Sequence, residues 1–247
     1  MTKPVFHGAV TLTAVRRPDL LARTLASFTE ALRQGFPVGP VFVNLDPVMG
    51  DARAQTECRD VVRAHFPEAK IFEPETASFG AAVIRLWTRV PDGPVLHLED
   101  DWTCLHEIDL DAARHFLNGK TTMVCFRNNH HGRKGEQDYS ETRHRYPVLW
   151  GLIRRKRRVP LFNTGPALAD GSFLRACALR MDATLDPEKQ MRRPMNPELN
   201  DWLERYRCRF LKAPDGGLLL TDDGREWRAA RGLDKHVADG RSVWSSR

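Results

Sequence analysis

The first hundred residues alternate between short apolar runs and longer segments in which apolar residues recur at helical spacing. Between Leu20 and Leu32 this spacing is clear, and Pro18 stands where a helix can begin. The pattern predicts strands at 5–15, 41–45, 69–72 and 94–98, with helices between them at 18–32, 52–65 and 80–90. This β-α-β-α-β-α-β order predicts an α/β protein with a mostly parallel, Rossmann-like sheet and helices on both faces.

After Trp102 the pattern changes. It predicts helices at 110–117 and 197–206, strands at 121–126, 209–212 and 218–220, and a C-terminal helix and tail at 224–247. Asn196 is placed to cap the second of these helices. The very polar stretch 127–145 predicts a mobile loop. We therefore expect an α/β half at 1–102 and a fused α+β half at 103–247, together forming one compact domain.

The composition is ordinary for a globular protein and excludes several classes. The chain has 247 residues, 41% of them hydrophobic, and a mean hydropathy of −0.47. No apolar run approaches the roughly 20 residues of a membrane span, and the N-terminus lacks a secretory signal, so we expect a cytoplasmic protein. The five cysteines are scattered without CxxC spacing, which indicates neither a zinc ribbon nor a disulfide framework.

The ends of the predicted strands carry the candidate chemistry. In an open parallel sheet, ligands bind at the carboxyl ends of the strands. Three of the predicted strands end in polar or charged residues: the first at Thr13 to Arg17, the second at Asp46 and the fourth at 99–101. The order of elements alone therefore places these residues at one ligand-binding edge.

The fourth strand ends in three consecutive carboxylates, Glu99-Asp100-Asp101. Like charges this close raise one another's pKa and destabilise the fold unless a cation neutralises them. A hard divalent ion, Mg²⁺ or Mn²⁺, suits carboxylates combined with phosphate oxygens. Alternation directs Glu99 and Asp101 to one side of the strand. We expect Asp101 to bind the metal directly and Glu99 to contact its waters or a sugar; the structural alternative is a solvated acidic turn or a helix cap.

These residues resemble the glycosyltransferases of the GT-A fold, in particular those built like the family 2 enzymes. Residues 13–18 are similar to that family's opening T-x-x-R-P turn, and Asp46 stands where it has an aspartate that binds uracil or ribose. Residues 78–85 look like its N-x-G-x-x-x-x-R segment, and the acidic triplet stands at its D-x-D motif. The resemblance implies a UDP-sugar or similar donor in the 1–102 half, contacted by Thr13, Arg16, Arg17, Asp46, Gly80, Arg85, Glu99 and Asp100.

The same resemblance implies an acceptor-binding and catalytic half at 103–247. Residues 165–175 look like the glycine-containing acceptor-side segment, and 221–228 like a late turn that brings a third metal or phosphate contact, with Asp222 joining Asp101 and Glu99 if the contact is to the metal. The helix at 197–206 resembles the element that positions a catalytic base. For an inverting transfer Glu198 is the first candidate for that base, with Asp201 and Glu188 as alternatives. Glu198 fits equally well as a first-turn acid that complements the helix dipole.

Charge leaves the acceptor open. The net charge is +6 and the pI about 9.3, and Arg154-Arg155-Lys156-Arg157-Arg158 form one compact basic run. Such a run is typical of a solvated loop, or it can grip a polyanion. The hydroxyl acceptor is therefore either a glycan, including an anionic one, or a hydroxylated base in DNA, with Tyr146 and Trp150 near the run as stacking candidates.

Two other functions compete with glycosyl transfer. A nucleotidyltransferase shares an α/β nucleotide site with acidic metal ligands, but it usually has a glycine-rich loop after the first strand, and residues 11–17 contain no glycine. A noncatalytic nucleic-acid-binding protein explains the pI and the basic run but leaves the acidic triplet without a role.

Overall fold

The computed structural model describes residues 4–126, 138–148, 153–238 and 241–246. A seven-stranded sheet has the order β10-β6-β9-β4-β1-β2-β3. All neighbours pair in parallel except β9, which is antiparallel to both β4 and β6. The mostly parallel sheet is confirmed. Its strands are β1 (Ala9–Val15), β2 (Val41–Asp46), β3 (Lys70–Phe72), β4 (Pro94–Glu99), β6 (Thr121–Phe126), β9 (Ala167–Asp170) and β10 (Arg207–Leu211).

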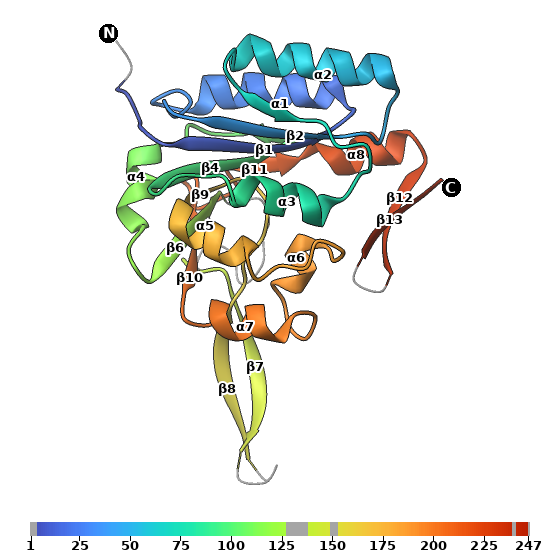
Figure 1. Ribbon diagram of the computed structural model, residues 1–247. Helices are drawn as coiled ribbons and strands as arrows, with labels where there is room; N and C mark the ends of the chain where they lie inside the picture. The colour runs from blue at the N-terminus through green and yellow to red at the C-terminus, as the bar shows by residue number, and fades with distance from the viewer. Residues whose placement is uncertain (1–3, 127–137, 149–152, 239–240, 247) are drawn as a thin grey trace.

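Helices cover both faces of this sheet, as predicted (Figure 1). Alternation along each strand sends side chains to two separate cores: Leu96 and Leu98 of β4 pack with α1 and α2, whereas Val95 packs with α3 and α5. No helix in the described ranges combines the length and apolarity needed to cross a membrane. The helices are α1 (Pro18–Ala31), α2 (Ala52–His65), α3 (Phe79–Trp87), α4 (Leu110–Phe116), α5 (Gly171–Ala178), α6 (Pro187–Gln190), α7 (Pro197–Leu203) and α8 (Asp223–Ala230).

Local chemistry sets where the helices begin. Pro18 occupies the first turn of α1, where its missing N–H is not needed. The Ser78 hydroxyl accepts a hydrogen bond from the Ala81 amide at the start of α3. Asn196 caps α7 through the Leu199 amide, which confirms the predicted cap. These starts matter for function because α1 and α3 both begin at the carboxyl edge of the sheet.

Two segments differ from the predictions. Residues 141–145, predicted as loop, begin β7 (Glu141–Val148), and the basic run lies in β8 (Ile153–Pro160) rather than in a loop. The two strands form an antiparallel hairpin that projects from the body (Figure 1). The predicted C-terminal tail is a second hairpin, β12 (Leu233–Ala238) with β13 (Arg241–Ser246). A two-stranded ribbon need not bury either face, so it has no apolar alternation to reveal it. Residues 127–137 of the predicted loop lie outside the described residues.

A small antiparallel pair connects the C-terminal part of the chain to the ligand edge. Strand β5 (Trp102–Cys104) follows the acidic triplet directly and pairs with β11 (Leu220–Asp222), so that Asp222 lies opposite Trp102. Helix α8 begins at the next residue, and the Asp223 amide donates to the Asp101 carbonyl over 3.0 Å. The start of α8 is therefore fixed beside Asp101.

His97 in β4 is a buried structural residue. Its Nδ1 lies 2.8 Å from the Thr11 hydroxyl and accepts a hydrogen bond from the Trp87 indole. Burial lowers the pKa of the imidazole to about 4. His97 is therefore neutral in the folded protein at neutral pH.

This lowered pKa predicts a loss of stability in mild acid. The unfolded chain binds a proton at His97 near pH 6.5, whereas the folded protein binds it only near pH 4, so stability is lost as the pH falls between these values. The His97 contribution is about 3 kcal/mol. Urea denaturation at pH 7 and pH 4.5 measures it, with His97→Gln as the reference. An equal fall in stability for both proteins contradicts the assignment.

Candidate active site

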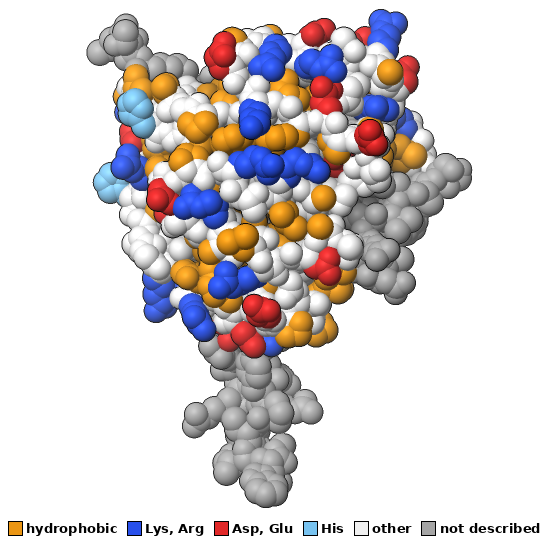
Figure 2. Space-filling view, in the orientation of Figure 1, with side chains coloured by type: hydrophobic (Ala, Val, Ile, Leu, Met, Phe, Trp, Pro, Cys, Tyr) orange, Lys and Arg blue, Asp and Glu red, His pale blue; other side chains and the backbone are white. Residues whose placement is uncertain are grey.

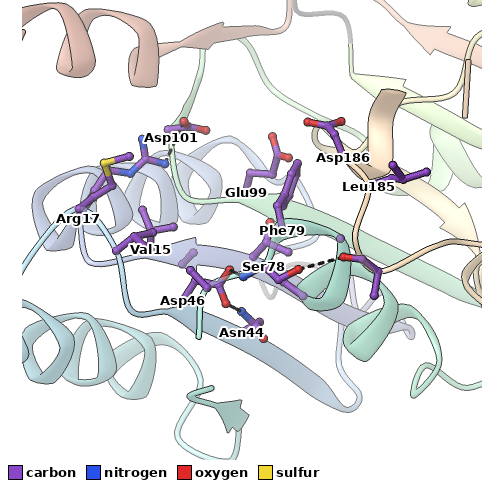
Figure 3. A pocket seen from close by; sticks show the side chains of 18 of the residues that line it. Val15, Arg17, Asn44, Asp46, Ser78, Phe79, Glu99, Asp101, Leu185 and Asp186 are labelled. Atoms are coloured by element: carbon purple, nitrogen blue, oxygen red, sulfur yellow. Dashed lines mark hydrogen bonds and ion pairs between the residues drawn. The ribbon is translucent and has the colours of Figure 1, made fainter. Parts of the chain in front are cut away.

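A pocket with a volume of about 480 Å³ lies at the carboxyl edge of β1, β2 and β4 (Figure 3). The start of α3, the segment 183–186 and Arg228 of α8 complete its wall. The place of the pocket is the one that the order of strands predicts. Six residues expected at the donor or the metal line it: Thr13, Arg17, Asp46, Gly80, Glu99 and Asp101.

Asp46, at the end of β2, is a buried carboxylate held in a fixed orientation. Its Oδ1 accepts from the Asn44 side-chain amide over 2.7 Å, and its Oδ2 accepts from the Ser78 amide over 3.1 Å. Arg85 donates to the side-chain Oδ1 of Asn44 and is not among the residues that line the pocket. Burial raises the pKa of Asp46, against the opposing effect of these hydrogen bonds and of the Arg85 charge. Arg85 therefore supports Asp46 from behind, through Asn44.

Gly80 allows one wall of the pocket to approach α3 closely. A Cβ at this position would lie 2.5 Å from the Leu185 carbonyl oxygen and 2.7 Å from that of Ala183. The Ser78 hydroxyl donates to the same Ala183 carbonyl over 3.1 Å. Gly80, which was expected to contact the nucleotide-sugar, lines the pocket. The close packing of residues 183 and 185 gives a second reason for a glycine at this position.

Asp100 is buried beneath the pocket and pairs with Arg17. The Arg17 guanidinium donates to both oxygens of Asp100, over 2.6 and 3.2 Å, and the Val15 amide donates to one of them over 3.1 Å. Burial raises the pKa of Asp100, and the Arg17 charge opposes this rise. Burial likewise disfavours the charged Arg17, but the two aspartates outweigh it and raise the pKa of the guanidinium. Asp100 is absent from the lining residues, so its position indicates a structural ion pair rather than donor contact.

Asp101 faces the pocket between two arginines. Its Oδ2 lies 3.1 Å from Nη2 of Arg17 and 3.8 Å from Nη1 of Arg228. The sequence argument held that the crowded carboxylates need a cation, and in the structure the Arg17 guanidinium already supplies one. The acidic triplet alone therefore does not demonstrate a metal site.

Glu99 lines the pocket on the same side of the chain as Asp101, as strand alternation predicts. The Trp102 indole donates to its Oε2 over 3.0 Å, and the Thr164 hydroxyl donates to its Oε1 over 3.2 Å. Two donors from different segments thus orient this carboxylate at the pocket.

Comparisons with known proteins bear on the fold. No protein-family model and no curated protein matches the chain. Among solved structures, it is similar to the mannosyltransferase PcManGT from Pyrobaculum calidifontis in complex with GDP-Man and Mn²⁺, with 12% identity and a TM-score of 0.56 over 94% of this chain. It is also similar to residues 1–349 of S. aureus TarS in complex with UDP, with 14% identity and a TM-score of 0.50 over 87% of this chain.

The fold is of the GT-A type. The matched region covers 62% of the mannosyltransferase and 60% of the TarS fragment, so this chain spans about three fifths of each. At these identities the likeness concerns the fold alone. Within a GT-A fold, the edge formed by β1, β2 and β4 is where this chain gathers its carboxylates.

Two carboxylates of this GT-A chain could hold a divalent cation. Burial raises the pKa of Asp222, and the negative charge of nearby Asp101 raises it further. The described residues contain no group of three or more histidine, cysteine, aspartate or glutamate side chains that could hold a metal. Mg²⁺ commonly takes only one or two protein carboxylates and completes its shell with water and phosphate oxygens. Asp222 is not among the residues that line the pocket, and its Oδ1 caps α8 by accepting from the Arg225 amide. With Asp101 it would fit such an ion only when a phosphorylated ligand supplies further oxygens.

Several expected site residues do not line the pocket. Arg16 donates to Gln55 and to the Gly50 carbonyl, on the side of the β1–α1 turn away from Asp101. Of the base candidates, Asp201 pairs with Arg193, Glu188 pairs with Arg192, and Glu198 is an exposed residue in the first turn of α7. The side chains of the run Arg154-Arg155-Lys156-Arg157-Arg158 lie outside the described residues.

Sequence reasoning missed two charged residues of the pocket. Arg228 comes from α8, and Asp186 caps α6, where its Oδ1 accepts from the amides of Glu188 and Lys189, each over 2.9 Å. Figure 3 shows Asp186 on the other side of Glu99 from the Arg17–Asp101 pair. The Asp-Pro start of α6 was a signal for the cap, but nothing local indicated that this helix borders the pocket.

Breaking the buried ion pair should lower the stability strongly, and removing both of its charges should restore part of the loss. Arg17→Met leaves the buried Asp100 carboxylate without its partner and should lower the free energy of unfolding by about 3 to 5 kcal/mol. The double variant Arg17→Met/Asp100→Leu should recover at least half of this loss, because it buries no unpaired charge. Urea denaturation measures both, and Arg16→Met serves as the matched surface control. A loss for Arg17→Met no larger than that of the control would contradict a structural role for the pair.

Proposed function

We propose that this protein is a glycosyltransferase that moves a sugar from a nucleotide-sugar to a hydroxyl acceptor with the aid of a divalent cation. The observation that carries the proposal is the gathering of Asp46, Glu99 and Asp101 around one pocket at the strand ends of a GT-A fold. A volume of about 480 Å³ is in the usual range for a small-molecule site. The solved complexes with GDP-Man and Mn²⁺ and with UDP support a nucleotide-sugar donor, and we propose a UDP-sugar.

In this proposal each wall of the pocket recognises one part of the donor. Asp46 is fixed by Asn44 and Ser78, so that it can accept a hydrogen bond from the base or the ribose. Asp101 and Asp222 would hold Mn²⁺ or Mg²⁺. When bound, this cation neutralises charge on the departing diphosphate. Glu99, held by Trp102 and Thr164, contacts the sugar.

Arg17 and Arg228 add positive charge at the same end of the pocket. Both guanidinium groups lie within 4 Å of Asp101 Oδ2. Such groups stabilise phosphate oxygens by charge-assisted hydrogen bonds. Arg17 is committed to the buried Asp100 as well, so Arg228 is the better candidate for direct contact with the diphosphate.

For the catalytic base we propose Asp186 in preference to Glu198 or Asp201. A general base must reach the acceptor hydroxyl, and Asp186 is the residue of these three that lines the pocket. Its carboxylate takes the hydroxyl proton as the acceptor oxygen forms a bond to the anomeric carbon. The bond from that carbon to the phosphate oxygen breaks on the opposite face, and the nucleoside diphosphate leaves, which inverts the anomeric centre.

The acceptor is a hydroxyl compound, and a polyanion such as an anionic glycan or DNA is compatible with the net charge of +6. The nucleotidyltransferase alternative lacks support in the β1–α1 turn. Only Arg16 and Arg17 stand between the end of β1 and the start of α1, so no glycine-rich phosphate loop fits there.

The first test of this function is donor turnover. With a set of UDP- and GDP-sugars and Mn²⁺, we expect slow release of nucleoside diphosphate, which excess chelator should abolish and added Mn²⁺ should restore. Asp101→Asn should lower turnover by about 100-fold or more, while Asp92→Asn, an exposed aspartate paired with Arg175, serves as the control. Thermal melting confirms that each variant folds. Undiminished turnover in chelator sinks the metal-dependent mechanism.

The second test separates the base candidates. Asp186→Asn keeps a good helix cap but cannot take a proton, so kcat should fall by about 10² to 10⁴-fold while the donor Kd stays within about twofold. Glu198→Gln should retain nearly full kcat. The measurements are steady-state transfer kinetics and donor binding by calorimetry. The opposite ranking of the two variants would return the base to α7.

A further inference from the structure

The net charge of the chain resides on a single element. The hairpin of β7 and β8, residues 141–160, contains seven of the 38 lysines and arginines but only one of the 32 acidic residues, Glu141. The rest of the chain holds 31 basic and 31 acidic residues and is formally neutral. On the face shown in Figure 2, basic and acidic side chains of the body are interspersed. The hairpin is therefore the element with the largest excess of positive charge that these counts identify, and it is the candidate contact for a polyanion.

The backbone of the hairpin brings these basic positions together. The antiparallel register pairs Arg143 with Arg158 and Arg145 with Lys156, so basic residues stand directly opposite one another. Like charges in such pairs destabilise a ribbon. The ribbon forms a sheet of its own with only two strands, and its strands gain nothing from other strands beside them. The positive charge is costly to the fold, which is the pattern of a surface built for an anionic partner.

The base of the hairpin is attached to the edge strand β10 and borders the segment that follows α6. The Ser140 amide donates to the Cys208 carbonyl of β10, and the Leu161 amide donates to the Ser140 carbonyl, each over 2.8 Å. A cavity of about 210 Å³ separates the hairpin base, at Thr142 and Val159, from residues 191–193. That segment directly follows α6, whose cap Asp186 lines the donor pocket. A polymer held by the hairpin would therefore lie on the side of the molecule that carries the segment following α6.

We infer that the β7–β8 hairpin is a binding arm for duplex nucleic acid, which it grips through the phosphate backbone. Strands of eight residues extend about 26 Å. A two-stranded β-ribbon fits the major groove of DNA, which is about 12 Å wide. The register gives both strands of such a ribbon basic positions, within reach of the phosphates that border the groove. This deepens the proposed function, since it identifies the acceptor as a hydroxylated base of DNA, but binding itself needs no donor.

The experiment compares two variants with the same net charge. Fluorescence anisotropy with a labelled DNA duplex, without nucleotide-sugar, gives Kd over a series of salt concentrations. The hairpin variant carries Arg154→Gln, Arg155→Gln, Arg157→Gln and Arg158→Gln. The control removes the same charge from exposed arginines of the body and carries Arg33→Gln, Arg53→Gln, Arg63→Gln and Arg114→Gln. Circular dichroism and donor turnover show whether each variant remains folded.

We expect the unaltered protein to bind the duplex with an affinity that falls steeply with salt. The hairpin variant should bind at least about tenfold more weakly, and its slope of log K against log salt should shrink by about 3 to 4, while the control changes less than about threefold. Donor turnover without acceptor should be the same in all three proteins. If the unaltered protein binds DNA but releases no nucleoside diphosphate from any donor, the result counts against the proposed glycosyl transfer and not against the binding arm.

Three results overturn the inference. The first is no binding of the unaltered protein to the duplex at low salt, which would leave the charge with the sole role of preventing edge-to-edge strand pairing. The second is equal weakening in the hairpin variant and the control. The third is displacement of the duplex by an equal charge concentration of an anionic polysaccharide or of anionic vesicles, which would assign the arm to a glycan or a membrane surface.

Discussion

The pocket depends on one buried guanidinium. Arg17 stands in the short turn between β1 and α1 and pairs with Asp100 at the end of β4. Strands β1 and β4 are neighbours in the sheet. An ion pair this deeply buried costs desolvation on both sides, and it is tolerable only because hydrogen bonds satisfy the charged atoms. With Asp100 held inward, alternation turns its two acidic neighbours outward. The internal pair is thus the reason that Glu99 and Asp101 face the pocket.

Around this point the fold collects charged groups that the chain keeps far apart. Asp46 belongs to β2, Arg228 to α8 and Asp186 to the cap of α6. Parallel pairing brings the strand ends to one edge, the missing Cβ of Gly80 lets the segment before α6 approach α3, and β5–β11 pairing returns the C-terminal part to the same place. Together these contacts give a pocket in which the guanidinium groups of Arg17 and Arg228 lie beside Asp101, while Asp46, Glu99 and Asp186 line other parts of its wall.

Sequence reasoning was successful where local pattern and architecture agree. The helix at 52–65 and the strand at 121–126 have the predicted bounds, and the strand ends at Asp46 and 99–101 meet as parallel topology requires. Periodicity worked there because each of these elements buries one or both faces. It failed for the β7–β8 hairpin, which is a sheet of two strands outside the main one. It also did not find Arg228 or Asp186, because their approach to the pocket is set by tertiary packing over long sequence separations.

The electrostatic reasoning was incomplete in an instructive way. Three adjacent carboxylates do demand a counter-charge, but the sequence could not say which cation provides it. The triplet is followed by a tryptophan and preceded by an apolar strand. Arg17, which pairs with its central carboxylate, lies more than eighty residues earlier in the chain. Only the strand order, with β1 beside β4, makes the two neighbours.

Helix α8 contacts Asp101 at Gly224, and this contact leaves no room for a side chain. A Cβ at Gly224 would lie 2.0 Å from Oδ2 of Asp101, which is closer than two non-bonded atoms can approach. Helix α8 therefore presents only backbone to this carboxylate. Even alanine at this position would have to push the acid out of place or lift the helix that carries Arg228. Because Gly224 lacks a Cβ, helix α8 can pack directly against Asp101, and Arg228 can line the same pocket.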